Sequence, residues 1–187
     1  ATRVARGAER RRTDAARARM ILVMSEPLVA PSSDFMRFLL ADQSGGFTPF
    51  ARALDGLSGE DAVRRPDGSP HSVAEVVAHL VFWQDRFLRM VDGEPPSPVP
   101  HASDGWPAVS ADEWPDLVAR FLANRERFRA LAADEAELSR PLVAGKDRSV
   151  GAAVASYHMH DAHHLGQVIL LRRLVGAWPP PGGGDTW

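Results

Sequence analysis

A regular stripe of side chains along residues 150–174 does most to constrain the fold of this chain. Its members are spaced by alternating steps of three and four residues, which places them on one face of an α-helix. They are Val150, Ala153, Tyr157, His160, His164, Gln167, Leu171 and Leu174. The stripe extends for about six turns, like the inner seam of a coiled coil. We therefore expect a helix from Ser149 to about Gly176 that packs against other helices.

Three more segments have helical patterns, and no segment alternates convincingly between apolar and polar residues as a strand would. The first helix is expected to begin with Ser33 or Asp34 as its N-cap and to run to about Leu57. Its predicted apolar face consists of Phe35, Phe38, Leu39, Phe50, Leu54 and Leu57. Two glycines and a proline at positions 45, 46 and 49 predict a bend or break near its middle.

Capping boxes mark the starts of the next two helices. The sequences SVAE at 72–75 and SADE at 110–113 each place a glutamate three residues after a serine, so that side chain and backbone can bond reciprocally. The second helix is expected to end near Val91. The third is expected to end near Ala133, and its regular part begins one turn after the serine because Pro115 lies too deep for an earlier start.

Four helices of roughly 20–28 residues predict an all-α four-helix bundle, whose interior is a common place for a metal or ligand site. The Pro-rich stretch 93–107 is expected to be a long surface connection between the second and third helices. We assign the bundle to residues 31–181, between a basic N-terminal arm at 1–30 and a tail at 182–187.

The basic arm stands out because the chain as a whole carries a net charge of −2. Residues 1–20 hold seven arginines against Glu9 and Asp14, a local charge of +5. A nucleic-acid-binding tail is one interpretation, but a solvated leader, disordered or in a short helix, is simpler. The net charge gives no reason to expect nucleic acid or an anionic membrane as a partner. No apolar run approaches the ~20 residues that span a bilayer. The expected location is the cytoplasm.

Four of the seven histidines lie within one short stretch, at positions 158, 160, 163 and 164. His160 and His164 belong to the stripe and are one turn apart. At about 100° per residue, His163 lies some 80–100° from the stripe and His158 well over 100°, so both are expected to flank it. Buried neutral imidazoles need partners, because an unpaired polar group costs ~1–3 kcal/mol. A shared metal ion would satisfy both, and hydrogen bonds to Tyr157, Gln167 or a facing helix are the alternative.

A third ligand would have to come from another helix. His79 is the best candidate, because it lies in a helix that is apolar around much of its circumference. It could equally be a core histidine with an ordinary hydrogen-bond partner. His71 and His101 lie in predicted loops, where we expect them to be exposed to solvent and not to bind a metal. Asp161 could orient a ligand imidazole, act as a ligand itself, or form a surface ion pair. The chain has no cysteine, which excludes disulfides, thiolate metal sites and cysteine nucleophiles.

Two stretches of the sequence resemble the DinB/YfiT-like superfamily of metalloenzymes. They are RRPDGSPHSVAEVVAHLVFWQDRFL and, about eighty residues later, HDAHHLGQVILLRRLVGAWPP. The resemblance covers roughly residues 34–181, and its specific part is His-x-x-x-His followed closely by Gly-Gln and Arg-Arg-Leu. It implies a four-helix bundle with up-down-down-up topology. It also implies a divalent metal, zinc or nickel, held by His79, His160 and His164, and a homodimer.

Three protein ligands with a vacant position are typical of a catalytic metal site. Relatives in the superfamily include S-transferases and isomerases that use low-molecular-weight thiols, and others described as hydrolases. We therefore expect a metal-dependent enzyme acting on a small molecule, with transfer of a small thiol cosubstrate ahead of hydrolysis because no separate general base stands out. Tyr157 and Gln167 are candidates for contacts to the ligands or the substrate. The rival hypothesis is a non-catalytic bundle whose metal only holds two helices together.

Overall fold

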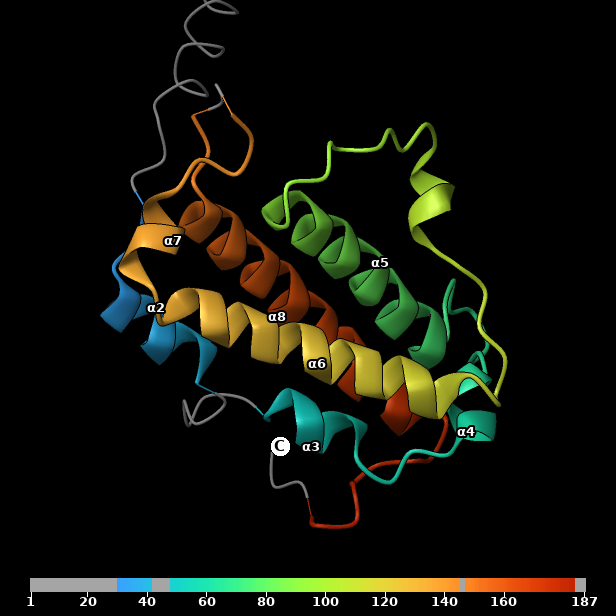
Figure 1. Ribbon diagram of the computed structural model, residues 1–187. Coiled ribbons are helices and arrows are strands. Elements are labelled where there is room, and N and C mark those ends of the chain that lie inside the picture. The colour runs from blue at the N-terminus through green and yellow to red at the C-terminus, as the bar shows by residue number, and fades with distance from the viewer. Residues whose placement is uncertain (1–29, 42–47, 145–146, 184–187) are drawn as a thin grey trace, which may run out of the picture.

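The computed structural model describes residues 30–41, 48–144 and 147–183, so most of the predicted basic arm and the end of the tail lie outside the described residues. Its core is built from three long helices, α5 (Val73–Val91), α6 (Trp114–Ala132) and α8 (Val150–Leu174). Figure 1 shows α5 and α6 lying beside α8, and α5 contacts both of the others. The described residues contain helices and no strand, which confirms the predicted all-α class.

The predicted first helix is two short helices instead of one long one. They are α2 (Ser33–Leu40) and α3 (Phe50–Leu54), and both lie along α8 (Figure 1). Residue 41 already has an extended backbone, so the break predicted from the glycines and the proline is present. Residues 42–47 lie outside the described part of the chain. The up-down-down-up order therefore stays a prediction.

The predicted apolar face of this segment is wrong in its first half. Phe35 and Phe38 are 53% and 67% exposed, whereas Met36 and Leu40 are buried. The N-cap is Ser32, whose hydroxyl accepts from the backbone N–H of Phe35, so the helix begins before the predicted cap. The prediction assumed that one continuous helix places residues on both sides of the break on the same face. Because the segment forms two separate helices, the buried face of the first cannot be inferred from that of the second.

The starts of α5 and α8 follow the predicted caps, Ser72 and Ser149. In the first capping box the backbone N–H of Ser72 donates to Glu75 at 2.8 Å, and the Glu75 N–H donates to the Ser72 hydroxyl at 3.2 Å. The predicted capping box of α6 is wrong in part: the Ser110 N–H donates to the carboxylate of Glu113 at 2.8 Å, but the N-cap of α6 is Glu113 itself, without a side-chain cap bond. The helix begins at Trp114, one turn after Ser110, as Pro115 predicted. Three short helices occupy the connections: α4 (Gly59–Val63), η1 (Ala102–Gly105) and α7 (Glu135–Ser139).

A buried polar layer divides the core into two apolar clusters. One cluster includes Leu80, Phe121 and Leu165, and the other includes Phe87 and Phe128. The layer itself consists of Gln84 on α5, Arg125 on α6, and His158 and Asp161 on α8. Because each long helix contributes to this layer, its hydrogen bonds tie all three together. No helix in the described part of the chain is long and apolar enough to cross a membrane.

Candidate metal centre

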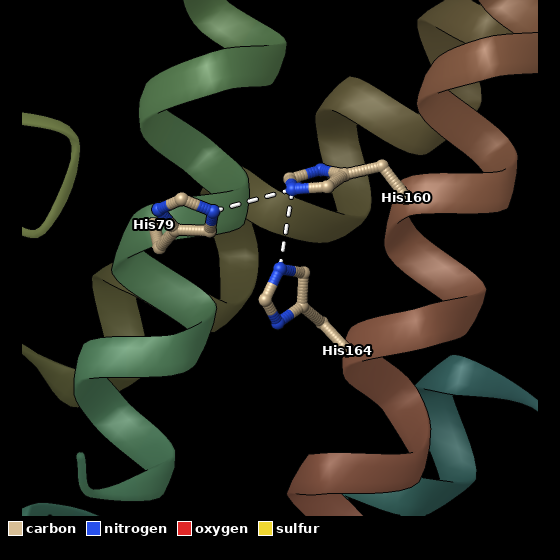
Figure 2. Close-up of side chains that lie close together, drawn as sticks. All are labelled: His79, His160 and His164. Carbon is tan, nitrogen blue, oxygen red and sulfur yellow. Dashed lines mark hydrogen bonds between the residues drawn. The ribbon is translucent and has the colours of Figure 1, made fainter. Parts of the chain in front are cut away.

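Three imidazole rings from two helices converge on one point between α5 and α8. Figure 2 shows His79 reaching out from α5 toward His160 and His164, which lie one turn apart on α8. Nε2 of His160 is 3.2 Å from Nε2 of His79 and 3.1 Å from Nε2 of His164. One nitrogen from each ring lies within 4.8 Å of the others. No fourth His, Asp or Glu of the described residues joins this group.

The far nitrogens of two rings are already occupied by acceptors, which determines where their protons lie. Nδ1 of His79 donates to the backbone carbonyl of Gly105 at 2.7 Å, because a carbonyl oxygen can only accept. Nδ1 of His164 donates to the side-chain oxygen of Gln167 at 2.6 Å. In a neutral imidazole the other nitrogen then carries a lone pair. Both Nε2 atoms therefore direct lone pairs at His160, whose single Nε2 proton could satisfy only one of them well.

These distances fit a shared divalent ion better than they fit hydrogen bonding among three neutral rings. Zinc lies about 2.0–2.1 Å from imidazole nitrogen, so two nitrogens in a tetrahedral site are about 3.3–3.4 Å apart. The observed separations of 3.2 and 3.1 Å are close to that value. The hydrogen bonds from Nδ1 of His79 to Gly105 and from Nδ1 of His164 to Gln167 are of the kind that orients metal-binding histidines.

Burial favours the neutral rings that a metal requires. It lowers the pKa of His160 to about 4, with further lowering by the positive charges that His164 and His79 would carry if protonated. Burial is also the largest influence lowering the pKa of His79 and of His164, although their hydrogen bonds to Gly105 and Gln167 act in the opposite direction. All three rings are thus available as ligands at neutral pH, because metal binding competes with protonation.

The stripe on α8 identifies the inward histidine pair, but it misplaces one flanking residue. His163 is exposed, as expected, whereas His158 is only 4% exposed and its ring lies 6.4 Å from that of Phe50. The prediction that His158 only flanks the interior is therefore wrong. The reason is that α8 contacts α2, α3, α5, α6 and α7, so it is buried on more than one side.

The three other predicted site residues, Tyr157, Asp161 and Gln167, have different surroundings in the structure. Gln167 contacts a candidate ligand directly, through His164. Asp161 is fully buried but accepts hydrogen bonds from Gln84 at 2.9 Å and from Arg125 at 3.3 Å. Its described partners are thus in the polar layer and include no imidazole. Tyr157 stacks on Phe87 with ring centroids 4.7 Å apart, and burial raises the pKa of its phenol.

The sequence did not indicate that the Pro-rich connection would wall the site. Trp106 lies between two histidine rings, 3.7 Å from the ring of His71 and 3.9 Å from that of His79, nearly parallel to both. His71 is half-buried by this stack and not simply solvated, whereas His101 is exposed as expected. The adjacent Gly105 packs tightly, because a β-carbon there would lie 3.1 Å from Nε1 of Trp83. The only local signal was a Gly-Trp pair in a segment otherwise typical of a surface loop.

A small hollow adjoins the centre at His160. It has a volume of ≈ 220 Å³ and is lined by Trp83, Arg148, Ser156, Tyr157 and His160. One of the three convergent rings therefore forms part of the wall of a space that a small molecule could enter. A centre with three histidines and an adjoining hollow resembles a catalytic site more than a closed structural site.

Residues 49–168 match the family model described as the DinB superfamily. This range is more than half of the chain and includes all three histidines, with α5 and the first part of α8. No curated protein and no solved structure gives a match.

Proposed function

Since this chain belongs to the DinB superfamily, we propose that His79, His160 and His164 bind one divalent metal ion in a metal-dependent enzyme. The observation that carries the proposal is the convergence of imidazole nitrogens at 3.1 and 3.2 Å with no fourth described ligand. Zinc and nickel are the ions we propose, because neutral imidazole suits both. The proposal includes a small-molecule substrate and a homodimer, in line with the family resemblance.

The chain's own groups would position the ligands and limit the access of water. The Gly105 carbonyl and the Gln167 side chain hold two rings with their Nε2 atoms inward. Trp106 covers the ring of His79 on one face. A divalent ion held there would supply Lewis-acid chemistry, which lowers the pKa of a thiol or a water that reaches it.

Thiol transfer fits the surroundings of the hollow better than hydrolysis does. Hydrolysis by an activated water is usually assisted by a separate base. None of the five residues that line the hollow is a carboxylate, and the nearby Asp161 bonds to Arg125 instead. A thiol needs less help, since its ordinary pKa of ~8.5 is already close to neutrality. We therefore propose a transferase that uses a low-molecular-weight thiol, with a metal-dependent hydrolase as the second candidate.

The test compares metal-free, zinc-loaded and nickel-loaded protein in conjugating a panel of small thiols to a chromogenic electrophile. We expect conjugation well above the uncatalysed rate with metal-loaded protein alone and with one thiol preferred. Chromogenic esters are assayed in parallel. Ester cleavage without conjugation would favour the hydrolase, and inactivity toward both substrate classes with metal bound would contradict the enzymatic proposal.

Removal of the Gln167 contact is expected to weaken metal binding without abolishing it. Gln167→Leu leaves His164 without the acceptor that orients its ring, and the loss of such a contact typically costs 10–100-fold in metal affinity. The measurement is competition with a chromogenic chelator. Gln167→Glu is the matched control, because it keeps an oxygen acceptor at that position and should bind at least as tightly as the unaltered protein. Equal affinity of Gln167→Leu and the unaltered protein would contradict the positioning role.

A further inference from the structure

The hollow beside the three histidines contains a cation that the proposed metal site does not use. Arg148 lines the hollow together with Trp83, Ser156, Tyr157 and His160. Its guanidinium makes no ion pair and no side-chain hydrogen bond with any residue that the structure describes. The neighbouring Arg86, in contrast, donates to the hydroxyl of Ser97 at 2.7 Å and does not line the hollow. Arg148 is therefore the arginine available to a ligand in this space.

The other walls are suited to a small molecule with an apolar body and an anionic end. Trp83 offers an aromatic face, and Ser156 and Tyr157 carry hydroxyl groups. A phenol is protonated at neutral pH and burial raises the pKa of Tyr157 further, so its O–H can donate to an anion. Arg148 immediately precedes Ser149, the N-cap of the 25-residue helix α8, so its backbone is fixed at the start of that helix.

We propose that this hollow is an oxyanion subsite, in which Arg148, assisted by the hydroxyl of Tyr157, binds a carboxylate or phosphate group of the substrate. This inference rests on the proposed function only in calling the ligand a substrate. The volume of ≈ 220 Å³ is below the ~300–1,000 Å³ of pockets for drug-sized ligands, which limits the ligand to a small molecule. With its anionic group at Arg148, such a molecule extends along Trp83 toward His160.

The experiment titrates metal-free protein with benzoate, its neutral isostere benzamide, and phenyl phosphate, following the indole N–H signal of Trp83 by NMR. A Trp83→Phe variant assigns that signal. We expect benzoate or phenyl phosphate to shift the signal saturably, and benzamide to bind at least about tenfold more weakly, since a charge-assisted bond is lost. A stronger response to phenyl phosphate identifies a phosphate ligand, and a stronger response to benzoate identifies a carboxylate.

Two arginine variants give the decisive comparison. Arg148→Gln should lose at least about tenfold in affinity for the anion, whereas Arg86→Gln, which removes a nearby charge already bonded to Ser97, should stay within about threefold. Arg148 is exposed, so the variant should remain folded. Equal losses in both variants, no loss in Arg148→Gln, or equal binding of benzamide would overturn the subsite. Metal content is measured separately, so a failure of the metal centre would not be mistaken for a failure of the anion site.

Discussion

Replacing His79 or His164 with alanine is expected to reduce the bound metal from about one ion per chain to near zero. Each change leaves two imidazoles, and they then compete poorly with chelators because a catalytic type of site has three protein ligands. The two residues come from different helices, so equal losses in both variants would show that the ion bridges α5 and α8. The measurement is elemental analysis of purified protein after dialysis against excess zinc or nickel.

His163→Ala is the matched control for this prediction. His163 is exposed and adjacent to His164 in the chain, with ring centroids 5.1 Å apart, but it is not part of the convergent group. It should keep the full metal content. Loss of metal from this variant, or full occupancy in His79→Ala, would rule out the three-histidine centre as we describe it.

The same variants separate a catalytic centre from a purely structural one. A bound ion stabilises the fold by an amount that grows with its free concentration relative to the dissociation constant. If the ion only holds α5 to α8, His79→Ala should lower the melting temperature as far as metal removal does, and no thiol conjugation should be found. If the centre is catalytic, loss of the metal should abolish thiol conjugation, and the metal-free protein should still unfold cooperatively because neither core cluster includes the three histidines.

The sequence was most informative where one helix determines the outcome by itself. The capping serines at 72 and 149 and the spacing of His160 and His164 depend on local geometry, and the structure confirms them. It was least informative where the outcome depends on neighbouring elements. Periodicity finds one apolar face, so it missed the burial of His158 on a helix with several neighbours. Nothing local indicated that Trp106, in a proline-rich connection, would stack between two histidines.

Asp161 shows the same limit, since its role depends on partners from two other helices. Its nearness in sequence to His160 favoured a role at the metal, whereas the fold pairs it with Arg125 and Gln84 in the polar layer. A buried acid with a buried arginine on a facing helix cannot be identified from either helix alone. The stability of the folded state is therefore expected to depend on the ion pair between Arg125 and Asp161.

Arg125→Met is expected to destabilise the fold by about 3–5 kcal/mol at pH 8, because it leaves an unpaired buried carboxylate. Arg125 and Asp161 are 2% and 0% exposed, with 3.3 Å between nitrogen and oxygen. The guanidinium also lies 3.9 Å above the ring of Phe50, a contact that methionine would only partly replace. Denaturant unfolding measures the loss. Arg127→Met is the matched control on the same helix, since its pair with Asp92 is about half exposed and should contribute less than ~1 kcal/mol.

The deficit of Arg125→Met should also depend on pH in a definite direction. Burial raises the pKa of Asp161 to about 7, against the opposing effect of Arg125, while an unfolded aspartate titrates near 3.9. A raised carboxyl pKa means that the folded state binds more protons, so stability falls as pH rises through that range. Removing Arg125 raises the pKa further and extends the fall above pH 7. The deficit should therefore be larger at about pH 8.5 than at about pH 6, and a deficit below ~1 kcal/mol at both would mean that the pair does not stabilise the core.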